Sequence, residues 1–301
     1  MTQAMTLESP ATQRFRIAPS SAPLGNEVLG LDISEPLDEE TFAGLRAAFD
    51  RHSVLVYRNQ KLTPEQHIRF SKGFGELEVH VVAKYRLPGY PEIFRVSNIT
   101  ENGQRIGGSG EFWHTDLSYV ARPSRGSLLY SIEVPVRDGV VLGDTEFAST
   151  AAAYEALPTA MKKRLEGMVA VHRFTDVYSQ VARHRQGTVE LTAEEKAKVP
   201  EVRHPVIKVH PNTGRKCLFV NEGFTVAIDG MPADESQALL RELFDHCTRP
   251  QFIYRHQWQV GDLVMWDNWA TVHRATGGYS AEERRLLHRT TLKGEDTQNA
   301  R

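Results

Sequence analysis

Short apolar runs separated by turn residues recur along this chain and predict a protein built mainly of strands. Residues 15–34 alternate apolar runs with Gly, Pro and Ser, which indicates a pair of neighbouring strands. Later runs rich in β-branched and aromatic residues predict further strands at 53–60, 127–135, 167–174, 206–211, 216–221, 262–268 and 283–293. The second half of the chain is therefore dominated by strands.

A few segments instead repeat their apolar residues at helical spacing. One begins at Asp38, and its acidic first turn suits the helix dipole. The segment 63–75 carries a complete start signal: Thr63 can cap the helix, Pro64 occupies the first helical position, and Gln66 completes a capping box. Three further helices are expected, at 150–157, 159–166 and 232–247.

Strands decorated by helices predict a mainly β fold with helices, either a β-sandwich or a jelly roll that carries helical insertions. We expect one domain over residues 15–294, with a loose tail at 1–14 and another at 295–301. The polar stretch 179–203 lacks an apolar period. Two interpretations of it stay open, a lid over a site and a plain surface loop.

Composition narrows the classes of function. The 301 residues carry a formal net charge of -2 and no basic run, which argues against nucleic acid or a membrane surface as a partner. No stretch approaches the roughly 18 apolar residues of a membrane span, and the start lacks the apolar core of a secretory signal, so we expect a cytoplasmic protein. Cys217 and Cys247 form no metal motif and are expected to be reduced thiols, in the core or at the surface.

An ionisable pair, His114 and Asp116, interrupts the apolar segment "EFWHTDLSYV" at 111–120. Such a pair is costly to bury unless it is paired, solvated or bound to a ligand. We interpret the segment as a half-buried strand, on which residues two apart project from the same face. The imidazole and the carboxylate could then share one metal ion, with His273 in "LVMWDNWATVHRATGGY" as the third ligand.

A His-x-Asp motif with a distant histidine is the facial triad of non-haem iron(II) oxygenases, which leaves coordination positions open. The same three ligands could also bind zinc in a hydrolase. The short motif is common by chance, so alone it does not decide between a metal site and an ordinary pair. The other histidines are interpreted as surface or core residues: His172, His184, His204, His246 and His256.

Two arginines follow this region in "ERRLLHRTTL". The strand period places Arg285, Leu287 and Arg289 on one face. Guanidinium groups on an inward face require anionic partners and suit bidentate binding of carboxylates or sulfonates. Taken by itself, the segment favours paired surface arginines on an edge strand; together with the triad, it favours an anion site.

The chain resembles the taurine dioxygenase and 2,4-dichlorophenoxyacetate dioxygenase family in five ordered motifs: "WHTD", "GDTEF", "LFVNEGFT", "GDLVMWDN…VH" and "RRLLHRTT". The resemblance covers about 15–294 and implies a double-stranded β-helix (jelly roll). It also implies Fe(II), 2-oxoglutarate as cosubstrate, and O2. The implied reaction hydroxylates a small anionic organic substrate (a sulfonate, alkyl sulfate or aryloxyalkanoate), often with cleavage of a C–S or C–O bond, and releases succinate and CO2. The implied assembly is a homo-oligomer, a dimer or a tetramer.

The resemblance also assigns roles to single residues. His114, Asp116 and His273 match the iron ligands and are the implied catalytic centre. Thr145 matches a threonine that hydrogen-bonds 2-oxoglutarate, and Arg285 matches the arginine that binds its distal carboxylate.

The remaining assignments concern the substrate. Arg289 matches a second arginine, near both the cosubstrate and the anionic end of the substrate. His80, Leu117 and Phe224 resemble residues on the substrate side. Without the resemblance, Phe224 is interpreted as a core aromatic residue, and His80 can equally be a core histidine with its hydrogen bonds made inside the protein.

The sequence departs from the taurine enzymes at two positions. Ala83 stands where a tyrosine is expected at the substrate, and Gly110 stands near an expected asparagine. Both changes remove polar contacts for a small amino-sulfonate, so taurine dioxygenase proper is kept only as an alternative. The segment "FIYRHQWQVGDLVMWDN" is at least as similar to the aryloxyacetate enzymes.

Two alternatives from other classes stay open at this point. One is a zinc hydrolase on the same fold, and Arg285 and Thr145 argue against it because a hydrolase needs no site for 2-oxoglutarate. The other is a non-catalytic jelly-roll protein that binds an anion. The intact triad disfavours that alternative.

Overall fold

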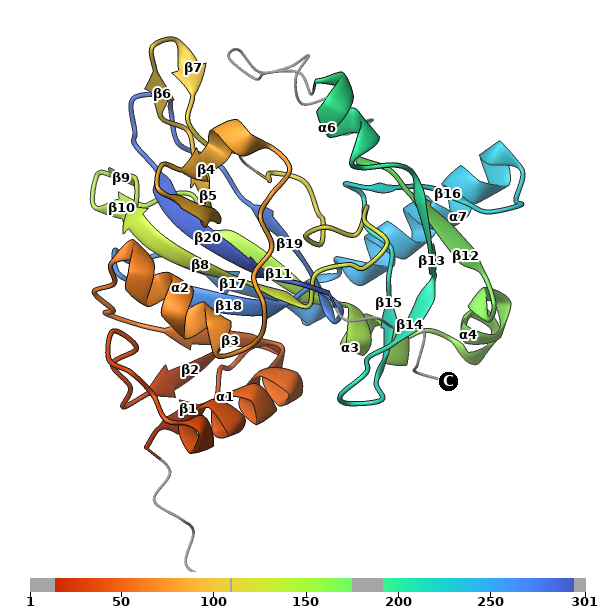
Figure 1. The fold of residues 1–301 in the computed structure, drawn as a ribbon. Coiled ribbons are helices and arrows are strands. Elements are labelled where there is room, and N and C mark those ends of the chain that lie inside the picture. The colour runs from red at the N-terminus through yellow and green to blue at the C-terminus, as the bar shows by residue number, and fades with distance from the viewer. Residues whose placement is uncertain (1–13, 109, 175–191, 295–301) are drawn as a thin grey trace, which may run out of the picture.

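The computed structural model describes residues 14–108, 110–174 and 192–294. Eight strands form its largest sheet: β1 (Arg16–Ala18), β2 (Asn26–Leu29), β3 (Val54–Tyr57), β4 (Arg86–Leu87), β5 (Tyr90–Ser97), β8 (Gly126–Glu133), β18 (Leu263–Asp267) and β20 (Leu286–Leu292). Their spatial order is β1-β2-β3-β18-β8-β20-β5-β4 (Figure 1). Neighbours pair antiparallel except β2 and β3, which run parallel.

A smaller sheet faces the large one and encloses the core of the domain. It contains β17 (Ile253–His256), β11 (Thr145–Ser149) and β19 (Thr271–Ala275). Phe147 of β11 lies in one buried cluster with Leu129, Val264 and Leu287 of the large sheet. Alternating side chains of both sheets thus meet in a common apolar layer. The predicted mainly β, jelly-roll fold is confirmed.

Two helices cover the other face of the large sheet (Figure 1). They are α1 (Glu39–His52) and α2 (Pro64–Lys72). Asp38 caps α1 by accepting a hydrogen bond from the Thr41 amide at 2.9 Å. Thr63 and Gln66 form the predicted capping box at the start of α2.

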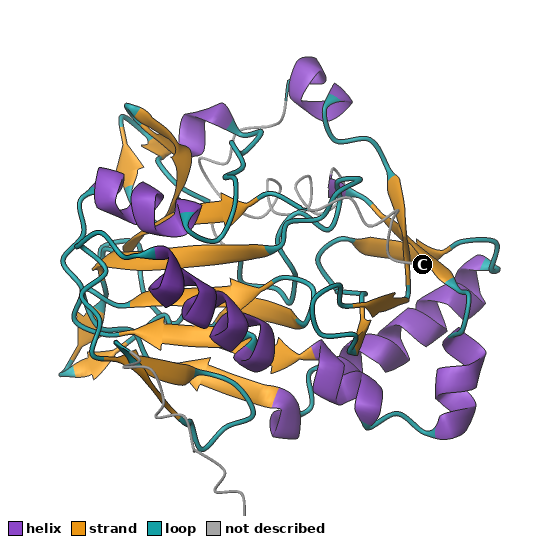
Figure 2. Ribbon diagram, turned by 60° about the horizontal axis from the view of Figure 1, so that its bottom comes forward, coloured by secondary structure: helices purple, strands orange, loops and turns teal. Residues whose placement is uncertain are grey.

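A second layer of helices and strands packs beside the two sheets (Figure 2). Its elements are α3 (Thr150–Glu155), α4 (Thr159–Leu165), β12 (Val169–His172), β13 (Val202–Pro205), β14 (Ile207–Val209), β15 (Lys216–Leu218), β16 (Thr225–Ile228) and α7 (Ala233–Cys247). All three helices predicted here are confirmed. The predicted strands of this region are confirmed as well.

The remaining elements are short: η1 (Ala83–Tyr85), β6 (Thr100–Glu101), β7 (Gln104–Arg105), β9 (Val136–Arg137), β10 (Val140–Val141), α6 (Ala193–Ala197) and η2 (Pro250–Phe252). Of the stretch interpreted as a lid or a loop, 179–191 lies outside the described residues. The rest of that stretch contains α6 and the start of β13. The tail residues 1–13 and 295–301 also lie outside the described residues.

The strand predicted over 111–120 is wrong. Only His114 pairs with a strand, through an isolated bridge to His273, and the chain then enters a turn. Leu117 has a φ of 56°, in the left-handed region. That conformation costs a leucine about 1 kcal/mol or more, so the surrounding contacts must impose it. No glycine or asparagine at this position announces the turn in the sequence.

Most of the histidines left without a role lie in the core, as one of the two interpretations expected. His172, His204, His246 and His256 are buried, whereas His184 lies outside the described residues. Cys217 and Cys247 are also buried, and both are free thiols. Over the described ranges, no helix combines the length and hydropathy that a bilayer crossing requires.

The buried histidines make stability depend on pH. His172 is fully buried, and burial, with smaller effects of the His204 and Lys208 charges, lowers its pKa to about 3. In the unfolded chain its pKa returns to the ordinary value near 6.5, so the unfolded state binds more protons below that pH. This contribution to stability is present above pH 6.5 and is lost as the pH falls towards the folded pKa.

We therefore expect His172→Phe to flatten the pH dependence of stability. Between about pH 7 and pH 5, the wild-type protein should lose about 2 kcal/mol more unfolding free energy than the variant, because only the wild type carries this histidine. Urea denaturation at both pH values measures the difference. Equal losses in the two proteins would contradict the assignment of a neutral, buried His172.

Candidate active site

Backbone pairing brings two distant histidines together. The His114 amide donates to the His273 carbonyl at 3.0 Å, and the His273 amide donates back to the His114 carbonyl at 2.7 Å. Because His273 lies on β19, this bridge attaches the loop that contains His114 to the small sheet. The two imidazole rings consequently lie side by side, with their centroids 4.2 Å apart.

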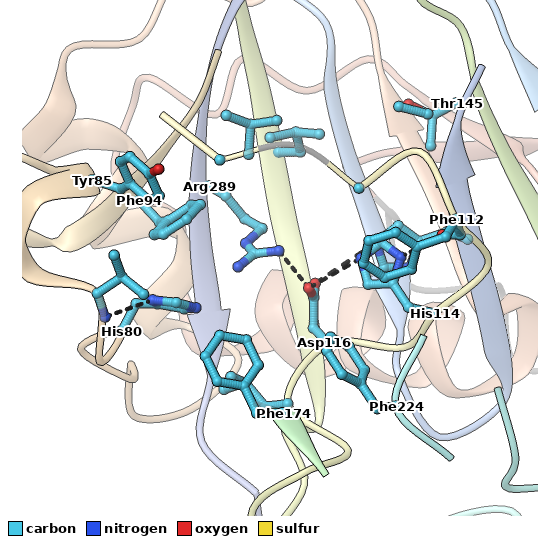
Figure 3. Close-up of a pocket in the computed structure, with 18 of the residues that line it drawn as sticks. His80, Tyr85, Phe94, Phe112, His114, Asp116, Thr145, Phe174, Phe224 and Arg289 are labelled. Carbon is cyan, nitrogen blue, oxygen red and sulfur yellow. Dashed lines mark hydrogen bonds and ion pairs between the residues drawn. The ribbon is translucent and has the colours of Figure 1, made fainter. Parts of the chain in front are cut away.

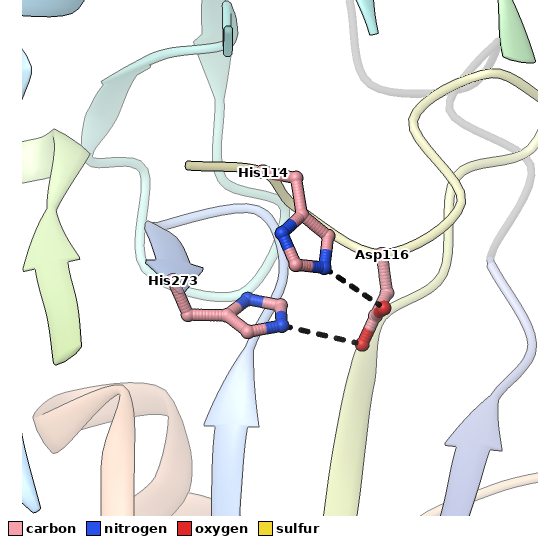
Figure 4. A group of neighbouring side chains, drawn as sticks. All are labelled: His114, Asp116 and His273. Carbon is pink, nitrogen blue, oxygen red and sulfur yellow. Dashed lines mark ion pairs between the residues drawn. The ribbon is translucent and has the colours of Figure 1, made fainter. Parts of the chain in front are cut away.

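The turn after His114 directs the Asp116 carboxylate at this pair (Figure 4). Asp116 Oδ1 lies 3.9 Å from His114 Nε2, and Asp116 Oδ2 lies 3.9 Å from His273 Nε2. One ligand atom from each residue lies within 4.8 Å of the others, and all three residues are buried. The side-by-side projection predicted from the sequence is confirmed, although a bridge and a turn produce it rather than a strand.

Hydrogen bonds and packing leave the right nitrogens available to a metal ion. His114 Nδ1 lies 2.8 Å from the Phe112 carbonyl, which can only accept, so this nitrogen carries the proton and Nε2 keeps its lone pair. His273 packs against Trp266 at 4.7 Å and Phe147 at 5.9 Å between ring centroids. Its Nδ1 has no hydrogen-bond partner among the described residues, so aromatic packing orients this ring.

The charge states also suit a divalent cation. Burial by itself would raise the pKa of Asp116, but opposing interactions, of which the Arg289 charge is the largest and the Ser127 hydrogen bond is another, lower it to about 2. Burial lowers the pKa of His114, and it lowers that of His273 well below the ordinary value. At neutral pH the site therefore presents one carboxylate and two neutral imidazoles, which is the donor set that iron(II) takes in facial triads.

Arg289 of β20 connects the triad to the neighbouring cavity. Its Nη1 donates to Asp116 Oδ1, and its guanidinium lies over the Phe94 ring at 5.0 Å. Arg289 Nε is buried and finds no acceptor in the part of the chain that the structure describes. This nitrogen can serve an anionic ligand, because a buried donor without a partner is costly.

Arg285 lies directly before β20 and is 2% exposed. Its Nη2 donates to the Gly143 carbonyl at 3.2 Å, and its guanidinium lies 5.9 Å from the Tyr279 ring centroid. Gly143 has a φ of 76°, and a Cβ there would lie 2.9 Å from Arg285 Nε, so only glycine fits beside this guanidinium. No carboxylate of the described residues forms an ion pair with Arg285.

Thr145 is the first residue of β11 and keeps a free donor. Its Oγ1 accepts a hydrogen bond of 3.0 Å from Trp258 Nε1, which can only donate. The hydroxyl hydrogen of Thr145 therefore remains available to a ligand. Thr145 is buried and lines the same cavity as Arg285.

That cavity has a volume of about 150 Å³ and contains all of the predicted site residues. They are His80, His114, Asp116, Leu117, Thr145, Phe224, His273, Arg285 and Arg289. In Figure 3, His80 and Thr145 lie on opposite sides of the Asp116–Arg289 pair, so the cavity has two ends. Asp116 is the only acidic side chain among the described residues that line it.

One wall of the cavity is aromatic. Tyr119 lies 4.3 Å from Phe174 and 4.7 Å from Phe224, measured between ring centroids, and Phe112 meets Phe224 edge-on at 6.0 Å. Of these four rings, only Phe224 was expected at the substrate from the sequence. The residues that line the cavity without having been expected from the sequence include Tyr85, Phe94, Arg105, Phe112, Tyr119 and Phe174. They come from separate segments, so no local motif could indicate them.

His80 presents a donor to the cavity. The Val82 amide donates to His80 Nδ1 at 3.1 Å, so neutral His80 carries its proton on Nε2. Burial, followed by the Arg289 charge, lowers its pKa to about 3, and the ring therefore stays neutral. It lies against Phe94, with ring centroids 4.3 Å apart.

The two departures from the taurine enzymes have structural consequences. Ala83 is exposed and does not line the cavity, but Tyr85, two residues later, does. Gly110 leaves no room for an asparagine, because a Cβ at this position would lie 2.3 Å from His114 Cε1. Glycine at 110 is thus a condition for the observed position of the His114 ring.

Comparisons with known proteins agree with this geometry. The profile of the family described as "Taurine catabolism dioxygenase TauD, TfdA family" matches residues 16–291. An alpha-ketoglutarate-dependent 2,4-dichlorophenoxyacetate dioxygenase of Cupriavidus pinatubonensis is 35% identical over 273 residues, which cover 87% of this chain and 91% of that protein. An alkylsulfatase of Acinetobacter baylyi is 32% identical over 293 residues, which cover 96% and 88%.

A solved structure is similar over the same length. The taurine dioxygenase from Burkholderia xenovorans has a TM-score of 0.77 and 33% identity, with 94% of this chain and 90% of that chain covered. The similarity therefore includes both sheets and the segments that contribute the triad.

Gly110→Ala tests the placement of the His114 ring. We expect the affinity for Mn(II), a redox-stable substitute for iron(II), to fall by about tenfold or more, because the new methyl group displaces a ligand. Calorimetric titration of the metal-free protein with Mn(II) measures this change in affinity. The thermal midpoint of the metal-free variant serves as the control for folding. An unchanged affinity in a folded variant would contradict the proposed constraint.

Proposed function

Because the chain belongs to the TauD and TfdA dioxygenase family, we propose that its substrate is an aryloxyalkanoate, an anion that joins an aromatic ring to a carboxylate-bearing carbon through an ether oxygen. The chain is an oxidoreductase that depends on Fe(II), 2-oxoglutarate and O2. This class replaces the alternatives of a zinc hydrolase and of a non-catalytic binding protein.

His114, Asp116 and His273 would bind the iron. When bound, Fe(II) would activate O2, the oxidant of the reaction, together with 2-oxoglutarate. The contributions of the chain itself are the orientation of both organic ligands, the exclusion of water and the binding of their negative charges. The burial of all three triad residues supports this division of roles.

Arg285 and Thr145 would bind the distal carboxylate of 2-oxoglutarate. The buried guanidinium of Arg285 has no carboxylate partner among described residues, and the Thr145 hydroxyl retains its donor hydrogen. A planar guanidinium can bind a carboxylate through two parallel hydrogen bonds. Figure 3 places Thr145 at one end of the cavity, and Arg285 donates to the carbonyl of Gly143, two residues before Thr145, which leaves the opposite end for the substrate.

One observation carries the choice of substrate: an aromatic wall and two spare hydrogen-bond donors line the substrate end of the cavity. Arg289 Nε and His80 Nε2 are available to a carboxylate. Phe174 and Phe224, whose ring centroids lie 6.0 Å apart, offer apolar faces to an aromatic ring. Taurine fits this end poorly, because its ammonium group would find no acidic side chain besides Asp116 in the described lining.

The proposed reaction balances as follows. One atom of O2 enters the C–H bond next to the ether oxygen, and the other enters succinate as 2-oxoglutarate loses CO2. The resulting hemiacetal breaks its C–O bond to the aryl oxygen and transfers its hydroxyl proton to that oxygen. The products are a phenol, a 2-oxo acid, succinate and CO2.

Alkyl sulfates are the second candidate. The similarity to the Acinetobacter alkylsulfatase extends over 96% of the chain, and the same two donors could bind a sulfate group. An alkyl tail could pack on the aromatic wall through apolar contact alone. A homo-oligomeric assembly and a cytoplasmic location stay predictions.

Succinate formation tests the proposal directly. The protein is incubated with iron(II), ascorbate, 2-oxoglutarate and air in the presence of aryloxyacetates, aryloxypropionates, alkyl sulfates or taurine. We expect substrate-dependent succinate with the aryloxyalkanoates and none with His114→Ala. Preferential turnover of alkyl sulfates would select the second candidate. Failure of every compound, combined with no anaerobic binding of 2-oxoglutarate to the iron-loaded protein, would reject this function.

Arg285→Lys tests the cosubstrate site. Lysine keeps the charge but loses the planar pair of donors, so the KM for 2-oxoglutarate should rise roughly 10- to 100-fold. Mn(II) affinity should not change, because Arg285 does not contact the triad. Arg284→Lys is the matched control: this neighbouring residue is exposed and pairs with Glu133 at the surface. Similar KM values in both variants would exclude Arg285 from cosubstrate binding.

A further inference from the structure

We propose that Asn268 and Ser127 are positioning residues that set the orientation of the Asp116 carboxylate towards the metal. This inference rests on the metal site proposed above. Both side chains are almost completely buried, and neither lines the cavity. Among the three proposed metal ligands, their side chains contact Asp116 alone, so any effect on the metal passes through that residue.

Asn268 is the centre of a fully satisfied set of hydrogen bonds. Its Oδ1 accepts from the Asp116 amide at 3.1 Å and from Trp266 Nε1 at 2.9 Å, while the Thr115 hydroxyl donates to the Asn268 backbone carbonyl at 2.5 Å. The amide and indole nitrogens can only donate, so the position of the Asn268 oxygen is fixed. Its Nδ2 must therefore be the donor on the other side.

That nitrogen orients the hydroxyl of Ser127. Asn268 Nδ2 donates to Ser127 Oγ at 3.1 Å and to Ser124 Oγ at 2.8 Å. Because Ser127 accepts from Asn268, its own hydrogen is left for Asp116 Oδ2, 2.7 Å away. The chain of hydrogen bonds thus runs in one direction, from Asn268 through Ser127 to the carboxylate.

Each oxygen of Asp116 consequently has one donor of its own. Oδ1 accepts from Arg289 and Oδ2 accepts from Ser127. The two donors together prevent rotation of the carboxylate and leave its remaining lone pairs facing His114 and His273. Without Ser127, Arg289 alone would determine the orientation of the carboxylate. Because Arg289 is also proposed to bind an anionic ligand, its position would change with ligand binding, and the carboxylate would change with it.

Asn268 also connects this support to the third ligand. It follows the last residue of β18, and the same short connection leads to His273 on β19. The Asn268 side chain therefore holds both the backbone amide of Asp116 and the Ser127 hydroxyl. Asn268 also begins the connection that leads to His273, so the same residue links both proposed ligands.

The test compares two serines of one strand. Ser131 also lies on β8 and is also fully buried; its hydroxyl accepts from the Asp262 amide at 3.0 Å and donates to the Gln259 carbonyl. Ser127→Ala and Ser131→Ala each remove one buried hydroxyl with the same number of hydrogen bonds. Only the first of them touches Asp116.

We expect Ser127→Ala to weaken Mn(II) binding by about tenfold or more, measured by calorimetry and by electron paramagnetic resonance of free Mn(II). Ser131→Ala should bind Mn(II) as the wild type does, while the thermal midpoints of the two metal-free variants fall by similar amounts. Equal affinities in Ser127→Ala and wild type would overturn the proposal. So would an equal loss of affinity in both variants, which indicates a general structural effect.

Asn268→Asp provides a second variant should Ser127→Ala fail to fold. It keeps the acceptor for the Asp116 amide but replaces the donor, so the Ser127 hydroxyl is drawn away from Asp116. We expect weaker Mn(II) binding, and wild-type affinity would overturn the proposal. If the wild-type protein itself does not bind Mn(II), the proposed metal site fails, which is a result distinct from the failure of the Asn268–Ser127 pair alone.

Discussion

The pair of backbone hydrogen bonds between His114 and His273 is the contact on which the rest of the site depends. It joins a loop to the last strand of the small sheet and fixes the distance between two ligands that are 159 positions apart in the printed sequence. The next bond along, from the Ala275 amide to the Gly110 carbonyl at 2.7 Å, continues the attachment. The loop therefore has little freedom to move a ligand independently of the sheet, and the glycine at 110 is part of the same constraint.

A second constraint is that the buried arginines need anionic partners for their charges. Placing a guanidinium in an apolar core is costly without an anionic partner. Arg289 meets this requirement through Asp116, and no ion pair of the described residues does so for Arg285. The fold therefore contains a positive charge whose partner is expected from outside the chain. Within the described chain, the Gly143 carbonyl accepts a hydrogen bond from this guanidinium, and the Tyr279 ring lies 5.9 Å from it, so the charge is only partly compensated.

Much of the fold could be predicted from the sequence because its signals are local. Helical spacing and an acidic first turn predicted α1, a capping box predicted α2, and apolar runs predicted the strands. The structure brings the predicted triad and the two arginines together in one cavity. The strand predicted at 111–120 was wrong, since the turn at Leu117 carries no residue typical of the left-handed region. The aromatic wall and the contacts of Asn268 could not be predicted, because they depend on side chains that meet only after the sheets have packed. Nothing in the local sequence distinguishes Asn268 from an ordinary turn residue, because the hydrogen bonds of its side chain reach Asp116, Ser124 and Ser127 on other segments and Trp266 on the adjoining strand.

Arg289 donates to the metal-binding carboxylate with one nitrogen and directs another, without a partner in the described chain, at the ligand cavity. An anion that attracts this guanidinium changes how strongly it holds Asp116. By thermodynamic linkage, the factor by which such an anion alters iron affinity equals the factor by which iron alters anion affinity. In the proposed site, retention of the metal and recognition of the substrate would thus be one coupled equilibrium, with Arg289 as the side chain that both share.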